Sequence, residues 1–244
     1  MSFSWRRVGA ILRKESRDYR RNRFVIGTMA ATPVLFIVLP MIQMFAANVS
    51  GNTAHLSLRI GLSLLYMLVI PVTMPSAVSA YSVVGEREQG TLEPVLTTPI
   101  RREEFLIAKA LAAFVPTLLI AYAVFGIFLG IAALFAHPVI ISAIYAGGHV
   151  LVQLLFTPLL AGWAIWVGIA VSARSTDVRV AQQLSLLGSV PPLIIVALMS
   201  LNVIAESTTL ALALAAALLA FDLLAWRIVA AMFDRERLVT GSRG

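Results

Sequence analysis

Six long apolar runs constrain this chain more than any other feature. They cover residues 24–47, 59–84, 106–135, 143–171, 184–205 and 209–232. About 20 apolar residues in a row is the length at which an α-helix crosses the hydrocarbon core of a bilayer. Hydrophobic residues make up 59% of the 244 residues and charged ones 13%, so water cannot hydrate most of the chain. We therefore predict an all-α integral membrane protein with six transmembrane helices in one domain, residues 24–244.

A basic segment, residues 1–23, precedes the first run. It carries eight Lys and Arg residues, and Trp5, Val8, Leu12 and Tyr19 recur at helical spacing. Such a helix lies flat on an anionic leaflet with its aromatic residues at headgroup level. We interpret it as an amphipathic interfacial helix, with a disordered basic tail as the alternative. A cleaved signal peptide is disfavoured, because the apolar run that follows is about 24 residues long, whereas the apolar region of a signal peptide is 7 to 15 residues long.

The cations are distributed unevenly between the two sides of the predicted bundle. Eighteen of the nineteen Lys and Arg residues fall at run ends on one side, and Arg59 alone falls on the other. Positively charged flanks of membrane spans stay in the cytoplasm. The net charge of +7 is thus assigned to membrane topology rather than to nucleic acid. Both termini and the polar segment 85–105 are predicted to be cytoplasmic.

The polar segment 85–105 separates the second run from the third. Thr91 can cap a short helix, with Glu93 and Pro94 in its first turn. The residues that would form one apolar face of this helix are Leu92, Val95 and Leu96. This pattern predicts a short amphipathic helix parallel to the membrane. The alternative is a solvated loop with a helix start.

A second cap-and-proline pattern follows in the same segment. Thr98 and Pro99 repeat the start signal, and Glu103 and Glu104 come next. Acidic residues are favoured in the first turn of a helix, near its positive end. The third membrane helix is therefore predicted to have its cap at Thr98.

Residues 86–109, EREQGTLEPVLTTPIRREEFLIAK, resemble the cytoplasmic signature between the second and third spans of type 2 ABC transporter permeases. The matching residues are Glu86, Arg87, Glu88, Gly90, Thr91, Leu92, Glu93, Leu96, Thr98, Pro99, Arg101, Arg102 and Lys109. The rest of the chain agrees in layout, including the polar link 172–183 between the fourth and fifth runs.

The resemblance implies the permease subunit of an ATP-driven transporter, expected to be an exporter, that works with other chains. Its partners would be two copies of an ABC ATP-binding subunit, which bind ATP and Mg, and a second permease chain, identical or different. The short helix would be the cytoplasmic coupling helix that docks the ATPase. The implied coupling residues are Glu86, Arg87, Glu88, Gly90, Thr91, Leu92, Glu93, Leu96, Thr98, Pro99 and Arg101.

The resemblance also carries expectations about location and substrate. It implies the bacterial inner membrane. Relatives handle small lipids, drugs, peptides and sodium, and the residues here do not select among them. The link 206–208 leaves no room for the re-entrant outer helices of some polysaccharide and lipid exporters, which disfavours a large polymer.

The chain itself carries no recognisable catalytic machinery. The phosphate-binding loop, GxxxxGK followed by Ser or Thr, does not occur in the sequence. We therefore predict that another chain hydrolyses ATP. With no cysteine, thiolate metal sites and thiol catalysis are excluded. The histidines, His55, His137 and His149, have no carboxylate at ligand spacing. We predict no catalytic residue, no metal site and no cofactor bound by this chain.

Four polar residues inside the apolar runs are candidates for a substrate pathway: Gln43, Gln153, Asn202 and Asp222. Polar groups are expensive in lipid, so each has either a function or a hydrogen-bonding partner on another helix. Asp222 lies near the middle of the last run, and an intramembrane carboxylate there is also compatible with an ion-coupled secondary transporter. No evident inverted repeat supports that class. A non-transporting membrane scaffold is a third reading.

Overall fold

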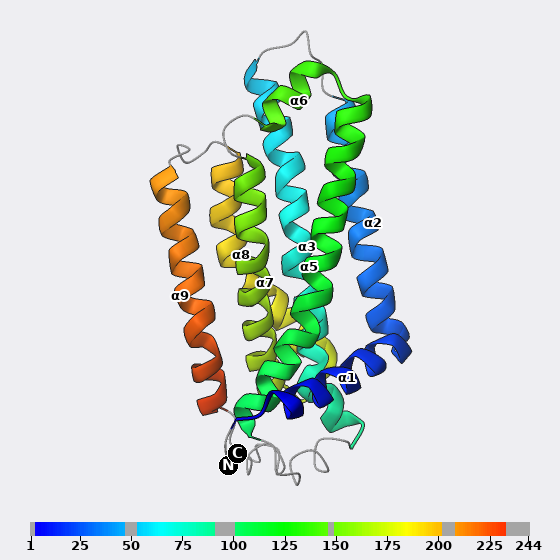
Figure 1. The fold of residues 1–244 in the computed structure, drawn as a ribbon, viewed down its shortest axis with the longest axis vertical. Helices are drawn as coiled ribbons and strands as arrows, with labels where there is room; N and C mark the ends of the chain where they lie inside the picture. The colour runs from blue at the N-terminus through cyan, green and yellow to red at the C-terminus, as the bar shows by residue number, and fades with distance from the viewer. Residues whose placement is uncertain (1–2, 47–52, 91–100, 146–148, 202–207, 233–244) are drawn as a thin grey trace.

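The computed structural model describes residues 3–46, 53–90, 101–145, 149–201 and 208–232. Within these ranges the helices are α1 (Trp5–Arg21), α2 (Arg23–Phe45), α3 (Thr53–Glu88), α5 (Arg102–Phe135), α6 (Pro138–Tyr145), α7 (His149–Arg174), α8 (Val178–Ser200) and α9 (Thr208–Met232). They form an elongated bundle, with α1 across one end and the short α6 at the other (Figure 1). No strand occurs among the described residues.

Six of the described helices are long and apolar enough to cross a membrane: α2, α3, α5, α7, α8 and α9. About half of the most apolar stretch of α3 and of α7 is buried, against 28% or less in the other four. The helices α3 and α7 therefore form the centre of the bundle, and the others surround them. The prediction of an all-α membrane protein with six spans is confirmed.

Apolar side chains pack along the whole length of the bundle. One buried cluster, around Phe105 and Ile169, lies toward the end that carries α1. Another, around Met67 and Phe128, lies toward the end that carries α6. The outer surfaces of α8 and α9 remain apolar and exposed, as expected for faces in contact with lipid.

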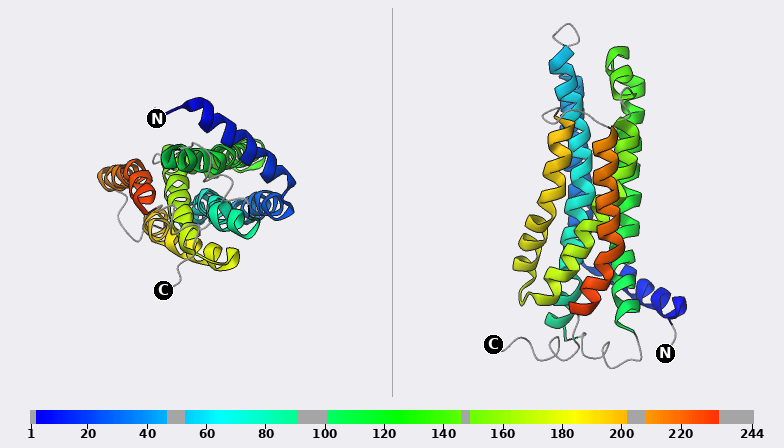
Figure 2. Two further views of the ribbon diagram at one scale, coloured as in Figure 1. Left: turned by 90° about the horizontal axis from the view of Figure 1, so that it is seen from below. Right: turned by 90° about the vertical axis from the view of Figure 1, so that its left-hand side faces the viewer.

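Helix α1 crosses the end of the bundle beside α2 and α5 (Figure 2). The predicted N-terminal helix is present, and one of its faces packs against the bundle. The buried residues are Val8, Ile11, Glu15 and Tyr19. Trp5 is 68% exposed and packs edge-on against Phe3, because it is the first residue of the helix and extends beyond the packed face.

The structure corrects several predicted helix boundaries. Helix α3 continues to Glu88, beyond the apolar run that ends at Val84, and α5 begins at Arg102, before the apolar run that begins at Leu106. Charged residues occupy these extra turns. Three of them, Glu86, Arg87 and Glu104, bond to groups on other helices, as described below.

The predicted link 172–183 is also mostly helical. Only Ser175 to Asp177 separate α7 from α8. The carboxylate of Asp177 accepts hydrogen bonds from the amides of Arg179 and Val180 and so caps α8. At the other end of the bundle, residues 143–145 belong to α6. They are not part of the fourth span, which begins at His149. His137 and Pro138 mark the turn from α5 to α6, as predicted.

Candidate functional site

The predicted coupling residues divide into two groups. Thr91, Leu92, Glu93, Leu96, Thr98 and Pro99 lie outside the described residues, as does the whole predicted short helix. Glu86, Arg87, Glu88, Gly90 and Arg101 flank that segment, in the last turns of α3, directly after α3, and directly before α5. The structure therefore describes both ends of the segment.

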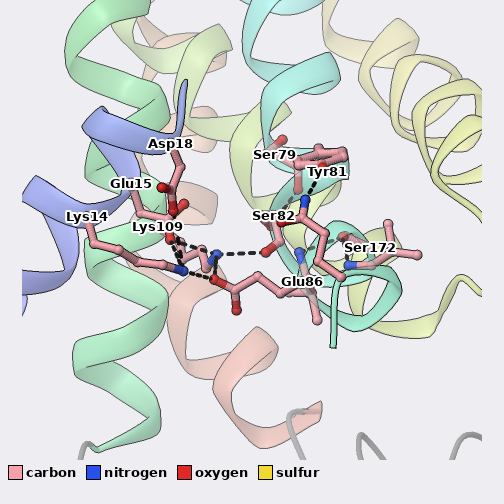
Figure 3. Close-up of polar contacts among 12 residues, drawn as sticks. Lys14, Glu15, Asp18, Ser79, Tyr81, Ser82, Glu86, Lys109 and Ser172 are labelled. Carbon is pink, nitrogen blue, oxygen red and sulfur yellow. Dashed lines mark hydrogen bonds and ion pairs between the residues drawn. The ribbon is translucent and has the colours of Figure 1, made fainter. Parts of the chain in front are cut away.

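A buried lysine joins three helices beside the end of α3. The ammonium of Lys109 in α5 donates to Glu86 Oε1 in α3 at 2.8 Å and to Glu15 Oε1 in α1 at 3.0 Å. It also donates to the carbonyl of Ser82 at 2.7 Å. Lys14 reaches the same oxygen of Glu86 at 2.6 Å. We call Lys14, Glu15, Glu86 and Lys109 the Lys109 cluster (Figure 3).

The pairing within the Lys109 cluster explains how its charges can be buried. Lys109 is 2% exposed, and an unpaired ammonium there would be very unfavourable. An ammonium has three donors, and the three acceptors named above use all of them. Two buried carboxylates face one buried ammonium, and the half-exposed Lys14 at the rim supplies the second positive charge.

Tyr19 of α1 lies close to the same charges. Burial raises the pKa of the Tyr19 hydroxyl well above its usual value, and the nearby carboxylates of Glu15, Glu86 and Asp18 raise it further. Tyr19 is therefore neutral at any physiological pH. A cavity of about 490 Å³ opens beside the Lys109 cluster, between α1, α3 and α5.

A second ionic contact fastens the beginning of α1 to the beginning of α5. The carboxylate of Glu104, fully buried, accepts two hydrogen bonds from the guanidinium of Arg7, at 2.7 and 2.8 Å. It accepts another from the amide of Ser4 at 2.7 Å. Two-pronged arginine–carboxylate pairs of this kind are strong and geometrically specific. We call Ser4, Arg7 and Glu104 the Glu104 anchor.

Glu104 also corrects the predicted start of the third span. Its carboxylate accepts a hydrogen bond from the amide of Arg101 at 3.2 Å, and Arg101 is the N-cap of α5. The cap is thus not Thr98. A glutamate three residues into a helix commonly reaches back to the N-cap amide, and here the same side chain holds α1 as well.

Arg87 fixes the other side of α3 to the corner between α7 and α8. Its guanidinium donates to the carbonyls of Ser175 at 2.9 Å and Ala173 at 3.3 Å, where the last carbonyls of α7 need partners. One turn earlier, the hydroxyl of Ser172 in α7 accepts hydrogen bonds from the amides of Val83 and Val84. The last turns of α3 are therefore held by α1 and α5 on one side and by α7 on the other.

Two of the predicted coupling residues at the α3 end make no contact described above. Glu88 and Gly90 are exposed. Gly90 has φ +66°, a left-handed conformation that glycine adopts without strain and that commonly ends helices. Arg101, at the start of α5, is also exposed. The two flanks thus present a charged surface at the end of the bundle that carries α1.

The candidate pathway residues are spread over different helices. Gln43 of α2 lines a small crevice beside Arg59, Gln153 of α7 is buried, and Asn202 lies outside the described residues. Asp222 of α9 packs against Gly162 of α7, where an added Cβ would lie 2.4 Å from its carboxylate. One Asp222 oxygen is buried without a hydrogen-bond partner in the described part of the chain. A role for these residues in transport stays a prediction.

Comparison with known proteins decides the family. The model of the family described as ABC-2 family transporter protein matches residues 9–236. The chain belongs to this family. A search of the curated proteins finds no match. The chain is accordingly an ABC transporter permease, a multi-pass membrane subunit of an ABC-2 transporter, and such permeases in general work with an ABC ATP-binding partner.

The sequence resemblance pointed to this ABC-2 family but missed the contacts that hold the flanks. Lys109 was part of the matched motif, whereas its partner Glu15 and the pair of Arg7 with Glu104 were not predicted. One signal was available. Glu15 falls on the same helical face as Val8, Ile11 and Tyr19, and an acid on an apolar face requires a partner.

Proposed function

We propose that this ABC-2 permease chain is one half of an exporter driven by ATP hydrolysis in a separate chain. Residues 85–105 dock that ATPase, with ATP and Mg bound by the ATPase alone. Two permease chains and two ATPase subunits make up the transporter. The end that carries α1 faces the cytoplasm, in keeping with the cations gathered there, and the membrane is the bacterial inner membrane.

The observation that carries this proposal is the attachment of both flanks of residues 91–100. The end of α3 is joined to α1 and α5 through Glu86, and to α7 through Arg87. The beginning of α5 is joined to α1 through Glu104. A displacement applied between these flanks passes into four helices at once, because each contact is short and each lies at least partly buried between helices. Transmission of this kind requires connected, rigid elements.

The docking proposal is tested with Leu92→Ala and Glu93→Ala in the full-length, tagged chain. We expect the wild-type chain, extracted in a mild detergent, to co-purify with a polypeptide that carries a phosphate-binding loop and hydrolyses ATP. The two substitutions should lower the recovered ATPase several-fold, while the yield and thermal unfolding of the permease stay unchanged.

Arg179→Ala provides the matched control, since this exposed residue lies at the same end of the bundle, at the start of α8. It should retain the ATPase. Equal retention in all variants, or an ATPase that never co-purifies with folded permease, would count against the proposal. Export is then tested by reconstituting the complex, with substrate movement measured away from the ATPase side.

The ion-coupled alternative receives no support from the family match. It remains distinguishable by experiment, because an ion-coupled carrier would transport without any ATPase present.

A further inference from the structure

A groove opens between α1, α2 and α5, on the other side of Tyr19 from the Lys109 cluster. Its volume is about 390 Å³. Leu111, Val115 and Leu119 of α5 line one wall at helical spacing, which extends for about 12 Å along the helix axis. Ile26 and Met29 of α2 line the opposite wall. Both walls belong to membrane-spanning helices.

The groove has a polar mouth at one end. Ser16, Tyr19 and Arg20 of α1 line it there, where α1 crosses the end of the bundle (Figure 2). Ser16 and Arg20 are exposed and make no hydrogen bond or ion pair with any part of the chain that the structure describes. Val115, Leu119 and Ile26 are exposed as well, by 46%, 66% and 47%. The groove thus passes from a cationic, hydrogen-bonding end to an apolar one, in the direction in which a membrane passes from headgroups to acyl chains.

The charge of the mouth decides which end of a ligand can bind there. The neighbouring cavity at the Lys109 cluster is lined by three carboxylates, Glu15, Asp18 and Glu86, which balance its three cations. The groove is lined by Arg20 and by no Asp or Glu. An anionic group is therefore favoured at its mouth, and a guanidinium is well suited to phosphate oxygens.

We propose that the groove holds one phospholipid with an anionic headgroup. Its phosphate is bound by Arg20 and Ser16, and one acyl chain lies along Leu111, Val115 and Leu119. The lipid fills the space between the last turn of α1 and the walls formed by α2 and α5, on the face of α1 that does not carry the Lys109 cluster. This inference concerns the permease chain alone and is independent of the proposed ATPase docking.

The experiment compares Arg20→Gln with Arg17→Gln in the delipidated, detergent-purified full chain. Arg17 is an exposed cation of the same helix that does not line the groove. Thermal unfolding is recorded with added phosphatidylglycerol or with phosphatidylcholine of the same acyl chains. Phosphatidylglycerol should raise the midpoint by several degrees more than phosphatidylcholine does. Arg20→Gln should abolish this preference, and Arg17→Gln should preserve it.

A second measurement separates the groove from general attraction of lipid to a basic helix. Val115→Trp fills the apolar wall without changing any charge. Native mass spectrometry should show one retained phosphatidylglycerol per chain in the wild type, and none in Val115→Trp or Arg20→Gln. An equal loss in Arg17→Gln and Arg20→Gln, or no preference for the anionic lipid, would overturn the proposal. Retention of the lipid by Val115→Trp would also overturn it.

Discussion

At the scale of single residues, Lys109 is a charged side chain that is almost fully buried and therefore depends on its partners. Its ammonium is almost fully buried and is held by two carboxylates from two other helices. Buried ion pairs add little net stability compared with well-packed apolar groups. Removing one partner is nevertheless costly, because the other charge is left buried and unpaired.

Lys109→Met keeps the length and helix propensity of the side chain but removes its charge. Glu15 and Glu86 then face each other with only the rim cation Lys14 to balance them. We expect a loss of about 3–5 kcal/mol in the free energy of unfolding, measured by reversible denaturation in mixed micelles.

Lys14→Met is the control for this substitution, because Lys14 is 42% exposed and its ion pairs are screened by solvent. It should change the free energy of unfolding by about 1 kcal/mol or less. Equal effects of the two substitutions would show that Lys109 is not the buried centre of the cluster.

At the scale of secondary-structure elements, α1 is attached to the bundle at two points about two turns apart in sequence. The Glu104 anchor holds its beginning, and the Lys109 cluster holds its middle. Between these points Val8 and Ile11 pack on Ala108 of α5. The helix is thus part of the folded bundle as well as a surface for lipid.

Arg7→Gln should loosen the beginning of α1 while leaving the Lys109 cluster intact. Glu104 would lose its two guanidinium hydrogen bonds, so the first turns of α1 should open more often. Hydrogen exchange followed by mass spectrometry should then be faster in peptides covering residues 4–12, and unchanged in those covering 208–232. Arg13→Gln provides the comparison, because within the described ranges Arg13 bonds to the carbonyl of Gly9 in its own helix and to no other group. Unchanged exchange in Arg7→Gln would show that the anchor does not hold this helix.

The same scale shows what sequence patterns can and cannot predict here. The six membrane helices were predicted because length and hydropathy are local properties of each run. The end of α3 was misplaced where charged residues continue the helix, as at Glu86, because a paired charge and a solvated one look alike in sequence. The burial of Glu15 depends on Lys109, which lies 94 residues away, and no local pattern contains that information.

At the scale of the whole molecule, the two ends of the bundle differ in charge. The described cations gather at the end that carries α1, and Arg59 lies at the other, donating to the carbonyl of Ala46 beside the end of α2. In the proposed orientation, which puts α1 on the cytoplasmic side, α6 lies on the opposite side, because α1 and α6 lie at opposite ends of the bundle (Figure 1).

This orientation can be tested with cysteine labelling, since the chain has no cysteine of its own. Arg17→Cys in α1 and Ser142→Cys in α6 place a thiol at exposed positions at opposite ends of the bundle. A membrane-impermeant maleimide should label Ser142→Cys in intact cells and Arg17→Cys only after the inner membrane is opened. The reverse pattern would invert the topology.

Because Lys109 is shared between two carboxylates, the order in which mutations replace the residues of the Lys109 cluster during evolution matters. Neutralising Glu15 or Glu86 first leaves Lys109 paired with the other buried carboxylate, whereas neutralising Lys109 first leaves two buried carboxylates with only Lys14 at the rim to balance them. The effects of these substitutions depend on one another. Divergence from this sequence should therefore proceed through loss of an acid before loss of the lysine.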